Sequence, residues 1–358
     1  MFERLHATFT SVGGNDIPEG FARPERTHQA VRSGVGVTQH PFGLIKITGD
    51  DATTFLGDTV TCRLPVEEGD VTYGFLLDPD GLIEVDMYIV NIGTGYLCVT
   101  SPGTATSLAE MLAERTFIQD VTVEDVSGGH AVFGVHGPMT ETMLTSVMRE
   151  GDPPSGDRPL SRGGIREVGL TLIDIDAPTG ETGVLVICET AGSAEVFDAL
   201  INLGAAAVPF GYATWLDLTL EAGTPLFETE LIGRSPNVCG QLGDTVDLSK
   251  GCFVGQEVVA RTANLGTIRE RIVGLTIEEV TDARVPLVDD GTSVGTLTRS
   301  ADSPSLGRPI AMGVLDTRLE VGATVEVVDS GANATVVDLP VVETGWTSVR
   351  LPRYEDGT

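Results

Sequence analysis

Lysine is almost missing from this chain: among its 358 residues only Lys46 and Lys250 are lysines. Basic residues of both kinds number 22 against 52 acidic ones, so the formal net charge at pH 7 is -30. So strong a negative charge repels nucleic acids and anionic membrane surfaces. We therefore expect no nucleic acid and no membrane among the partners of the protein.

The acidic residues are spread along the chain and are not collected in a tail. Together with the shortage of lysine, this pattern resembles proteins from halophiles, in which high internal salt screens the repulsion between like charges. An ordinary acidic enzyme is the alternative, although acidity alone would not exclude lysine.

Paired cysteines and metal-binding histidine patterns are also missing. The five cysteines, at positions 62, 98, 188, 239 and 252, are odd in number and show no CxxC spacing. The five histidines, at positions 6, 28, 40, 130 and 136, form neither an HxH nor an HExxH pattern. These spacings argue against a disulfide framework and against structural zinc, and we predict no metal site.

Long apolar runs are missing as well. No run reaches the ~18 residues that a membrane-spanning helix needs, and residues 1–4 do not begin a signal peptide. The hydrophobic fraction of 41% is that of a globular protein, which we expect to be cytoplasmic. A chain of 358 residues exceeds what one hydrophobic core supports, so two or three domains are expected.

Reactive side chains are concentrated in one stretch, residues 247–261. It contains Lys250, Gly251, Cys252, Gly255, Gln256, Glu257 and Arg261. The thiol of Cys252 lies between two cations in the sequence, which favours the nucleophilic thiolate form. The glycines allow the backbone to approach a ligand closely. The alternative is that Cys252 is a small buried hydrophobe, as most free cysteines are.

Two strand-like runs, residues 71–77 and 82–90, are joined by the turn sequence of residues 78–81 and predict a β-hairpin. In the second run Glu84 and Asp86 point to the same face, because side chains alternate along a strand. Two carboxylates on one face indicate either a function or simple contact with solvent.

Further along, helical spacing over residues 104–115 and an alternating run over 121–126 extend this hairpin into a small α+β unit. From residue 268 onward the pattern changes to short alternating runs with Gly and Asp turns. These runs predict a separate β-barrel or sandwich, with strands over residues 271–277, 293–299, 310–315, 323–328 and 333–338.

Three motifs carry a resemblance to known proteins. Residues 250–261, with the pattern Lys-Gly-Cys-Phe-x-Gly-Gln-Glu-x-x-Ala-Arg, resemble the signature of the YgfZ family, folate-binding relatives of the glycine cleavage T-protein, an aminomethyltransferase. Residues 220–226 resemble the T-protein pattern Leu-Glu-Ala-Gly-x-Pro-Leu. Residues 81–86 match its Gly-x-x-x-Asp-Asp pattern, with Val85 in place of the first aspartate. The likeness covers nearly the whole chain.

The resemblance implies an α+β fold in which three domains form a ring around a central channel. A discontinuous folate-binding domain would comprise residues 1–48 and 128–266, a ferredoxin-like unit residues 49–127, and a C-terminal β-barrel residues 267–358. Tetrahydrofolate or a one-carbon derivative would bind in the channel, and we expect a monomer.

The resemblance also implies site residues. Asp86 would contact the pterin and support chemistry at N5 of folate. Glu221 would hydrogen-bond the pterin ring, whose N–H groups suit a carboxylate, unless it is an ordinary glutamate near a helix end. Cys252 would be the functional thiol at the rim of the channel, and His40 would lie near the channel, unless it is a solvated turn residue. The other predicted cofactor contacts are Glu230, Lys250, Gly251, Gly255, Gln256, Glu257 and Arg261.

Three functions remain open. We favour a YgfZ-type protein that binds tetrahydrofolate and uses Cys252 in iron–sulfur cluster assembly or repair, with iron–sulfur client proteins as partners. T-proteins carry an aspartate-type residue where Cys252 stands. The alternative is a folate-dependent aminomethyltransferase or related one-carbon transferase that works with a lipoyl-carrier protein, in which Asp86 positions the pterin. The third is a non-catalytic interaction module, against which the intact Asp86, Glu221 and Cys252 argue.

Overall fold

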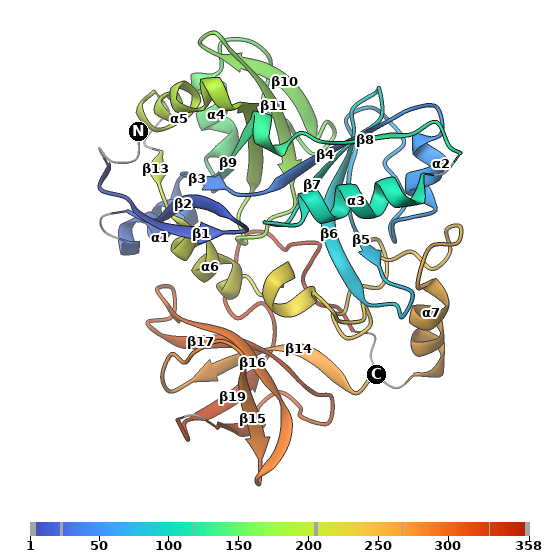
Figure 1. Ribbon diagram of the computed structural model, residues 1–358. Coiled ribbons are helices and arrows are strands. Elements are labelled where there is room, and N and C mark those ends of the chain that lie inside the picture. The colour runs from blue at the N-terminus through green and yellow to red at the C-terminus, as the bar shows by residue number, and fades with distance from the viewer. Residues whose placement is uncertain are drawn as a thin grey trace.

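The computed structural model describes residues 5–21, 24–116, 118–203, 207–266, 268–328 and 330–354. Three large sheets form its framework, and a two-stranded hairpin of β1 (Thr8–Val12) and β2 (Asn15–Gly20) precedes them. In Figure 1 the two open sheets lie above a closed barrel. The predicted α+β class with a C-terminal β-barrel is confirmed.

The first sheet has six strands in the order β10-β11-β12-β9-β3-β13, and only the pairing of β13 with β3 is parallel. These strands are β3 (Gly36–His40), β9 (His130–His136), β10 (Leu160–Ile165), β11 (Val168–Ile175), β12 (Gly183–Glu189) and β13 (Val208–Pro209). Helices α4 (Thr140–Val147) and α5 (Ser193–Asn202) bury apolar residues such as Leu144 and Phe197 against it. Helices α1 (Pro24–Ser33) and α6 (Tyr212–Glu221) pack on each other through Val31 and Trp215.

The second sheet has five strands in the order β5-β6-β7-β4-β8. They are β4 (Gly43–Thr48), β5 (Val71–Leu77), β6 (Ile83–Asn91), β7 (Tyr96–Thr100) and β8 (Thr122–Asp125). Strands β5 and β6 form the predicted hairpin, and Gly81 in its turn adopts a positive φ of 76°. Helices α2 (Ala52–Gly57) and α3 (Ala105–Arg115) cover one face of this sheet through residues such as Phe55 and Leu108.

The third sheet closes on itself as a barrel in the order β14-β17-β16-β15-β18-β19, because β14 also pairs with β19. Its strands are β14 (Glu270–Ile277), β15 (Val285–Asp289), β16 (Thr292–Ser303), β17 (Arg308–Asp316), β18 (Thr324–Val327) and β19 (Asn333–Val337). Closure removes the unpaired strand edges that an open sheet of this size would leave.

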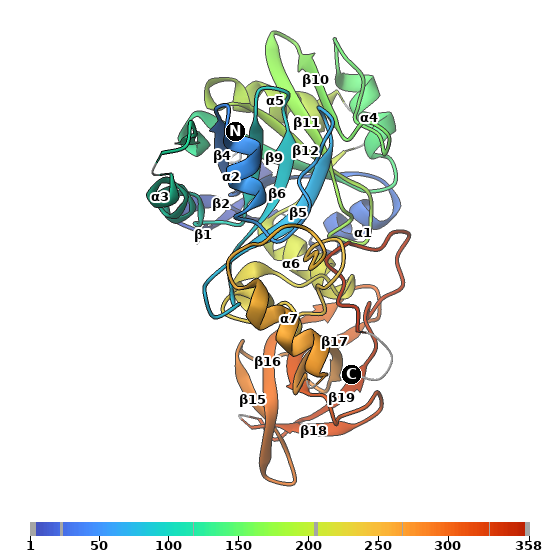
Figure 2. The ribbon, with the colours of Figure 1, turned by 90° about the vertical axis from the view of Figure 1, so that its right-hand side faces the viewer.

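One hydrophobic cluster, which we call the central core, joins the three sheets. It contains Phe75 of the five-stranded sheet, Ile173 of the six-stranded sheet and Ile310 of the barrel. Helix α7 (Gln256–Leu265) runs from the tip of the β5–β6 hairpin along the barrel in Figure 2. The last described segment leaves the barrel and runs between it and the two open sheets, as Figure 1 shows, and its last residues line a pocket together with the end of α7.

Candidate functional site

Asp86 lies in the middle of β6 and points toward the centre of the molecule. It is only 2% exposed, so it does not belong to a solvated face. The next residues on the same face, Tyr88 and Val90, belong to the central core. The hydroxyl of Tyr73 on β5 donates a 2.7 Å hydrogen bond to Oδ2 of Asp86. Its Oδ1 is buried and makes no hydrogen bond of normal geometry with a described residue, although the Ser101 hydroxyl lies nearby. A buried acceptor without such a bond is unusual and marks a place where a ligand or water can bind.

A small pocket, which we call the Asp86 pocket, lies beside this carboxylate. Its walls are Phe42, Tyr73, Asp86, Met87, Tyr88, Val99, Thr100, Ser101 and Arg350. The cavity has a volume of about 20 Å³, which is enough for roughly one water molecule. The space at the centre of the molecule, between the three sheets, is therefore nearly filled.

Arg350 fills much of this centre and comes from the far end of the chain. Its guanidinium carbon lies 5.3 Å from the ring centre of Tyr73 and 5.6 Å from that of Tyr88, within cation–π range. Its Nε is 3.5 Å from Oδ2 of Asp176, which follows β11. Asp176 also accepts hydrogen bonds from the hydroxyls of Tyr88 and Ser348. The motifs in the sequence gave no signal for Arg350 or Asp176.

Burial raises the pKa of the Asp86 carboxyl above its ordinary value, although the nearby Ser101 and Tyr73 hydroxyls and the Arg350 charge oppose the shift. Burial and the neighbouring carboxylates also raise the pKa of the Tyr73 and Tyr88 hydroxyls well above 10.0. Both tyrosines therefore keep their protons at neutral pH and act as hydrogen-bond donors.

His40 is not a solvated turn residue, because it is only 3% exposed. Its ring stacks on Phe42, a wall of the Asp86 pocket, with ring centres 4.4 Å apart. Its Nε2 lies 3.3 Å from Nε2 of His136. Burial lowers the pKa of His40 well below 6.5 and that of His136 to about 3. Both rings are therefore neutral at physiological pH and lie behind the pocket wall.

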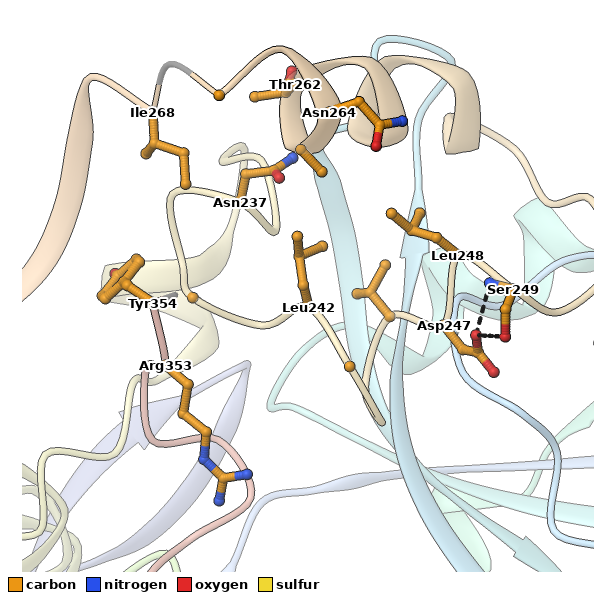
Figure 3. Close-up of a pocket in the computed structure, with 15 residues that line it drawn as sticks. Asn237, Leu242, Asp247, Leu248, Ser249, Thr262, Asn264, Ile268, Arg353 and Tyr354 are labelled. Atoms are coloured by element: carbon orange, nitrogen blue, oxygen red, sulfur yellow. Dashed lines mark hydrogen bonds between the residues drawn. The ribbon is translucent and has the colours of Figure 1, made fainter. Parts of the chain in front are cut away.

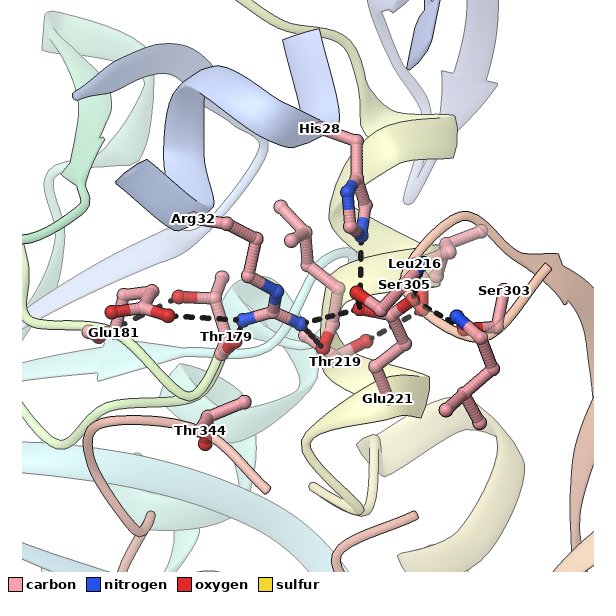
Figure 4. A network of polar contacts seen from close by, with 12 residues as sticks. His28, Arg32, Thr179, Glu181, Leu216, Thr219, Glu221, Ser303, Ser305 and Thr344 are labelled. Carbon is pink, nitrogen blue, oxygen red and sulfur yellow. Dashed lines mark hydrogen bonds and ion pairs between the residues drawn. The ribbon is translucent and has the colours of Figure 1, made fainter. Parts of the chain in front are cut away.

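Glu221 at the end of α6 lies in a different network (Figure 4). Its Oε2 accepts hydrogen bonds from His28 Nε2 at 2.9 Å and from Arg32 at 2.7 Å, both on α1. Ser303 and Ser305, at the end of the barrel strand β16, donate to its Oε1. Burial alone would raise the pKa of Glu221, but the hydrogen bonds from His28, Ser303 and Arg32 lower it overall. The carboxylate is therefore ionised and links α1, α6 and the barrel.

Glu230 lies in a single π-helical turn, η4 (Phe227–Leu231), and is also fully buried. It accepts hydrogen bonds from Thr298 at 2.6 Å and from the backbone N–H of Leu226 at 2.9 Å. Arg299 of the barrel forms an ion pair with it at 3.3 Å. Donors of the protein itself occupy the oxygens of Glu221 and Glu230. The predicted contact of either carboxylate with folate stays a prediction.

The cysteine motif forms a loop and the start of α7. Lys250 Nζ donates to the carbonyl of Gly57 at 2.6 Å and lies over the Phe253 ring, so this cation already has partners of its own. Gly255 has a positive φ of 78°, and a side chain there would meet the carbonyl oxygen of Asp78 at 2.6 Å. This glycine lets the motif pack on the hairpin turn.

The other residues of the motif lie mainly toward the surface. Cys252 is exposed, whereas the other four cysteines are buried. Gln256 donates to the carbonyl of Leu248, and Glu257 pairs with Arg261 on the surface of α7. Gly251 is also exposed. None of these residues lines the Asp86 pocket, so the structure does not bring the predicted thiol and the predicted carboxylate together.

A larger cavity of about 550 Å³ lies next to the motif (Figure 3). Its walls come from the loop between Asn237 and Ser249, from the end of α7 and the residues just after it, and from the last described residues, Arg353 and Tyr354. Leu242, Leu248 and Ile268 make part of it apolar. No group of three metal-binding side chains occurs among the described residues. None of the described helices is both long and apolar enough to cross a bilayer.

Comparison with known proteins gives two family matches. Residues 1–250 match the GCVT N-terminal domain, and residues 270–343 match the glycine cleavage T-protein C-terminal barrel domain. The chain is 30% identical to the aminomethyltransferase of Cutibacterium acnes, with 95% of this chain and 96% of the relative covered. It is 31% identical to that of Streptomyces avermitilis, covering 88% and 87% of the two chains.

Solved structures of similar fold are known as well. The glycine cleavage system aminomethyltransferase T from Bartonella henselae superposes with a TM-score of 0.84 over 97% of both chains. The sequence identity of the two proteins is 20%. This comparison therefore supports the architecture of the three sheets.

Proposed function

The chain belongs to the glycine cleavage T-protein family, and from this premise we propose that it is a tetrahydrofolate-dependent one-carbon transferase of the aminomethyltransferase type. Relatives with that name align with nearly the full chain. This reverses the order of preference drawn from the cysteine motif, because the full-length relatives favour the transferase over a YgfZ-type role. A lipoyl-carrying protein is the partner that this activity implies.

Asp86 carries the proposal. Its Oδ1 is a buried acceptor that makes no hydrogen bond of normal geometry with a described residue, and the N–H groups of a pterin are donors that suit it. The hydroxyl of Tyr73 holds the other oxygen and so fixes the orientation of the carboxylate. Buried at the centre, such a preorganised acceptor acts more strongly on a ligand than it would in water.

The chemistry of the Asp86 pocket fits a pterin, but its size does not. Phe42, Tyr73 and Tyr88 offer aromatic faces on which a flat ring can stack. The volume of about 20 Å³, however, is room for roughly one water molecule. We therefore derive no reaction step through folate from this closed form.

Titration of the protein with tetrahydrofolate at high salt tests the proposal. We expect micromolar-range binding that weakens at least about tenfold in Asp86→Asn, because the variant loses the charge and one acceptor. Tyr73→Phe is the matched variant, since it removes only the hydroxyl that orients the carboxylate, and we expect a smaller loss. Binding that is unchanged in Asp86→Asn would remove this carboxylate from the site.

Transfer activity tests the rest of the proposal. The assay measures one-carbon transfer from an aminomethyl-loaded lipoyl carrier to tetrahydrofolate, and we expect activity in the wild type and none in Asp86→Asn. A protein that binds folate without transferring the group would contradict the transferase assignment.

A role in iron–sulfur maintenance is the second candidate, and the exposure of Cys252 favours it. A surface thiol can react with a partner, whereas the four buried cysteines cannot. In Cys252→Ala the two functions separate, because transfer should persist while support of an iron–sulfur enzyme is lost. Loss of transfer alone would instead place the thiol in the transferase reaction.

A further inference from the structure

The segment that closes the Asp86 pocket lies beyond the barrel that matches the family, which ends at residue 343. We call residues 344–354 the C-terminal strap. The backbone N–H of Trp346 bonds to the carbonyl of Gly180 in the six-stranded half of the molecule. The N–H of Arg353 bonds to the carbonyl of Gly240, beside α7. The strap therefore crosses the centre where the three sheets meet.

The strap is held by the side chains of Ser348, Arg350 and Tyr354, and the Tyr354 hydroxyl accepts a hydrogen bond from the N–H of Ile272 and donates one to the carbonyl of Val238, both at 2.8 Å. Ser348 and Arg350 are buried, whereas Trp346 is 56% and Val349 47% exposed. Ser348 donates to Asp176, and the amide of Gln241 donates to the carbonyl of Arg350. Local opening of a surface segment such as residues 344–351 costs less free energy than the unfolding of a core element.

The Arg350 guanidinium resembles part of the ligand that the pocket is proposed to bind. It is planar, carries several N–H donors, stacks on Tyr73 and Tyr88, and pairs with the carboxylate of Asp176. Neither of its two terminal nitrogens hydrogen-bonds another described residue. The 2-amino-4-oxo ring of a pterin has a guanidine-like edge, with the same flat shape and the same N–H donors. The face of the pterin ring would stack on Tyr73 and Tyr88, and its N–H edge would pair with the carboxylate of Asp176.

We propose that Arg350 is an internal pseudo-ligand: the strap keeps its guanidinium in the place that the pterin ring of folate takes when it binds. The ligand displaces Arg350, stacks on Tyr73 and Tyr88, and gains Asp176 as an acceptor in addition to Asp86. This inference rests on the proposed function for the identity of the ligand. It explains why the pocket has the chemistry but not the volume for a pterin.

The consequence is that the strap competes with folate. When the binding-competent form is a minor fraction of the molecules, the apparent dissociation constant rises by the inverse of that fraction. A closed strap in about nine molecules of ten would weaken binding about tenfold. Removing the pseudo-ligand should restore that affinity, although it removes a buried cation from the site.

The test measures the binding of tetrahydrofolate, and of a free pterin without the glutamate tail, to the full chain and three variants. In Arg350→Ala we expect both ligands to bind at least about tenfold more tightly. In Ser348→Ala, which loosens the strap but keeps the guanidinium, we expect a smaller gain. Arg353→Ala is the matched control, because this arginine is in the same strap but is exposed and lines the larger cavity. We expect no change there.

Hydrogen exchange at the Trp346 amide gives a readout that needs no ligand. It should become faster in Arg350→Ala and in Ser348→Ala, and unchanged exchange in both would overturn the closed strap. Weaker or unaltered folate binding in Arg350→Ala would overturn the pseudo-ligand and make Arg350 a ligand contact or a bystander. If the wild type and all variants fail to bind folate or pterin, the proposed function itself is wrong. Thermal melting of each variant shows that it is folded.

Discussion

Replacing Glu221 by glutamine tests whether this carboxylate holds the fold together. The substitution keeps the shape of the side chain but removes its charge and exchanges one acceptor oxygen for an NH₂ donor. Donors of His28, Arg32 and Ser305 converge on Oε2. Ser303 Oγ and the Ser305 backbone N–H both donate to Oε1. An amide therefore leaves at least one buried donor without an acceptor, whichever way it is turned.

The size of the effect follows from the burial of the network. A hydrogen bond to a charged group contributes about 1.5–3 kcal/mol, and breaking a buried ion pair by removing one partner costs about 3–5 kcal/mol. Glu221 is fully buried and the Arg32 side chain is only 12% exposed, so solvent screens this pair little. We expect Glu221→Gln to lower the free energy of unfolding by about 3–5 kcal/mol at pH 7.

Equilibrium unfolding in denaturant measures this loss. The matched control is Glu257→Gln on α7, because the side chain of Glu257 is 85% exposed and pairs with Arg261 at the surface. Such a pair contributes about 0.3–0.5 kcal/mol. The pKa of Glu221 lies below its ordinary 4.5 in the folded protein. Its contribution is therefore complete above pH 4.5 and shrinks as the pH falls further, so the two proteins should converge in acid.

Two results would refute this reasoning. A loss below about 1 kcal/mol would mean that the network does not hold the three elements together. Unchanged stability with weaker folate binding would assign the carboxylate to the ligand site, as the family resemblance implies.

Three further predictions concern acid, thiol reagents and salt. Because His40 and His136 are buried as neutral rings, only the unfolded chain takes up their protons below pH 6.5. As the pH falls from 6.5 to 4.5, the free energy of unfolding measured in denaturant should decrease by up to about 1.4 kcal/mol per pH unit for each ring, and by less in His136→Gln. Cys252 alone should react with a thiol reagent in the native protein, so mass spectrometry should find one adduct, and none in Cys252→Ala. The net charge of -30 predicts that the melting temperature rises with potassium chloride more than with an uncharged osmolyte, and an equal rise would contradict a halophilic origin.

Local patterns predicted much of the fold because they depend on neighbouring residues. The turn at residues 78–81 and the alternation after it predicted the β5–β6 hairpin and the shared face of Glu84 and Asp86. The barrel strand β15 was missed because Pro286 lies inside it, and proline weakens any strand assignment.

The site itself depends on partners that are far apart in the sequence. Arg350 meets Asp176 across 174 positions, and Glu221 meets His28 across 193. Neither pair belongs to a sequence motif, because each residue on its own looks like any other charged residue in the sequence. The resemblance predicted Asp86 at the centre, but it could not predict that a segment beyond the family barrel covers this residue.

The central core has a consequence for how this architecture can be rearranged. The barrel has an interior of its own, yet it also contributes Ile272, Ile310, Met312 and Val314 to the cluster shared with the other sheets. If the barrel were produced without the rest of the chain, these side chains would form an exposed hydrophobic patch, and such patches drive self-association. Fusing this barrel to an unrelated protein would therefore require polar replacements at those positions.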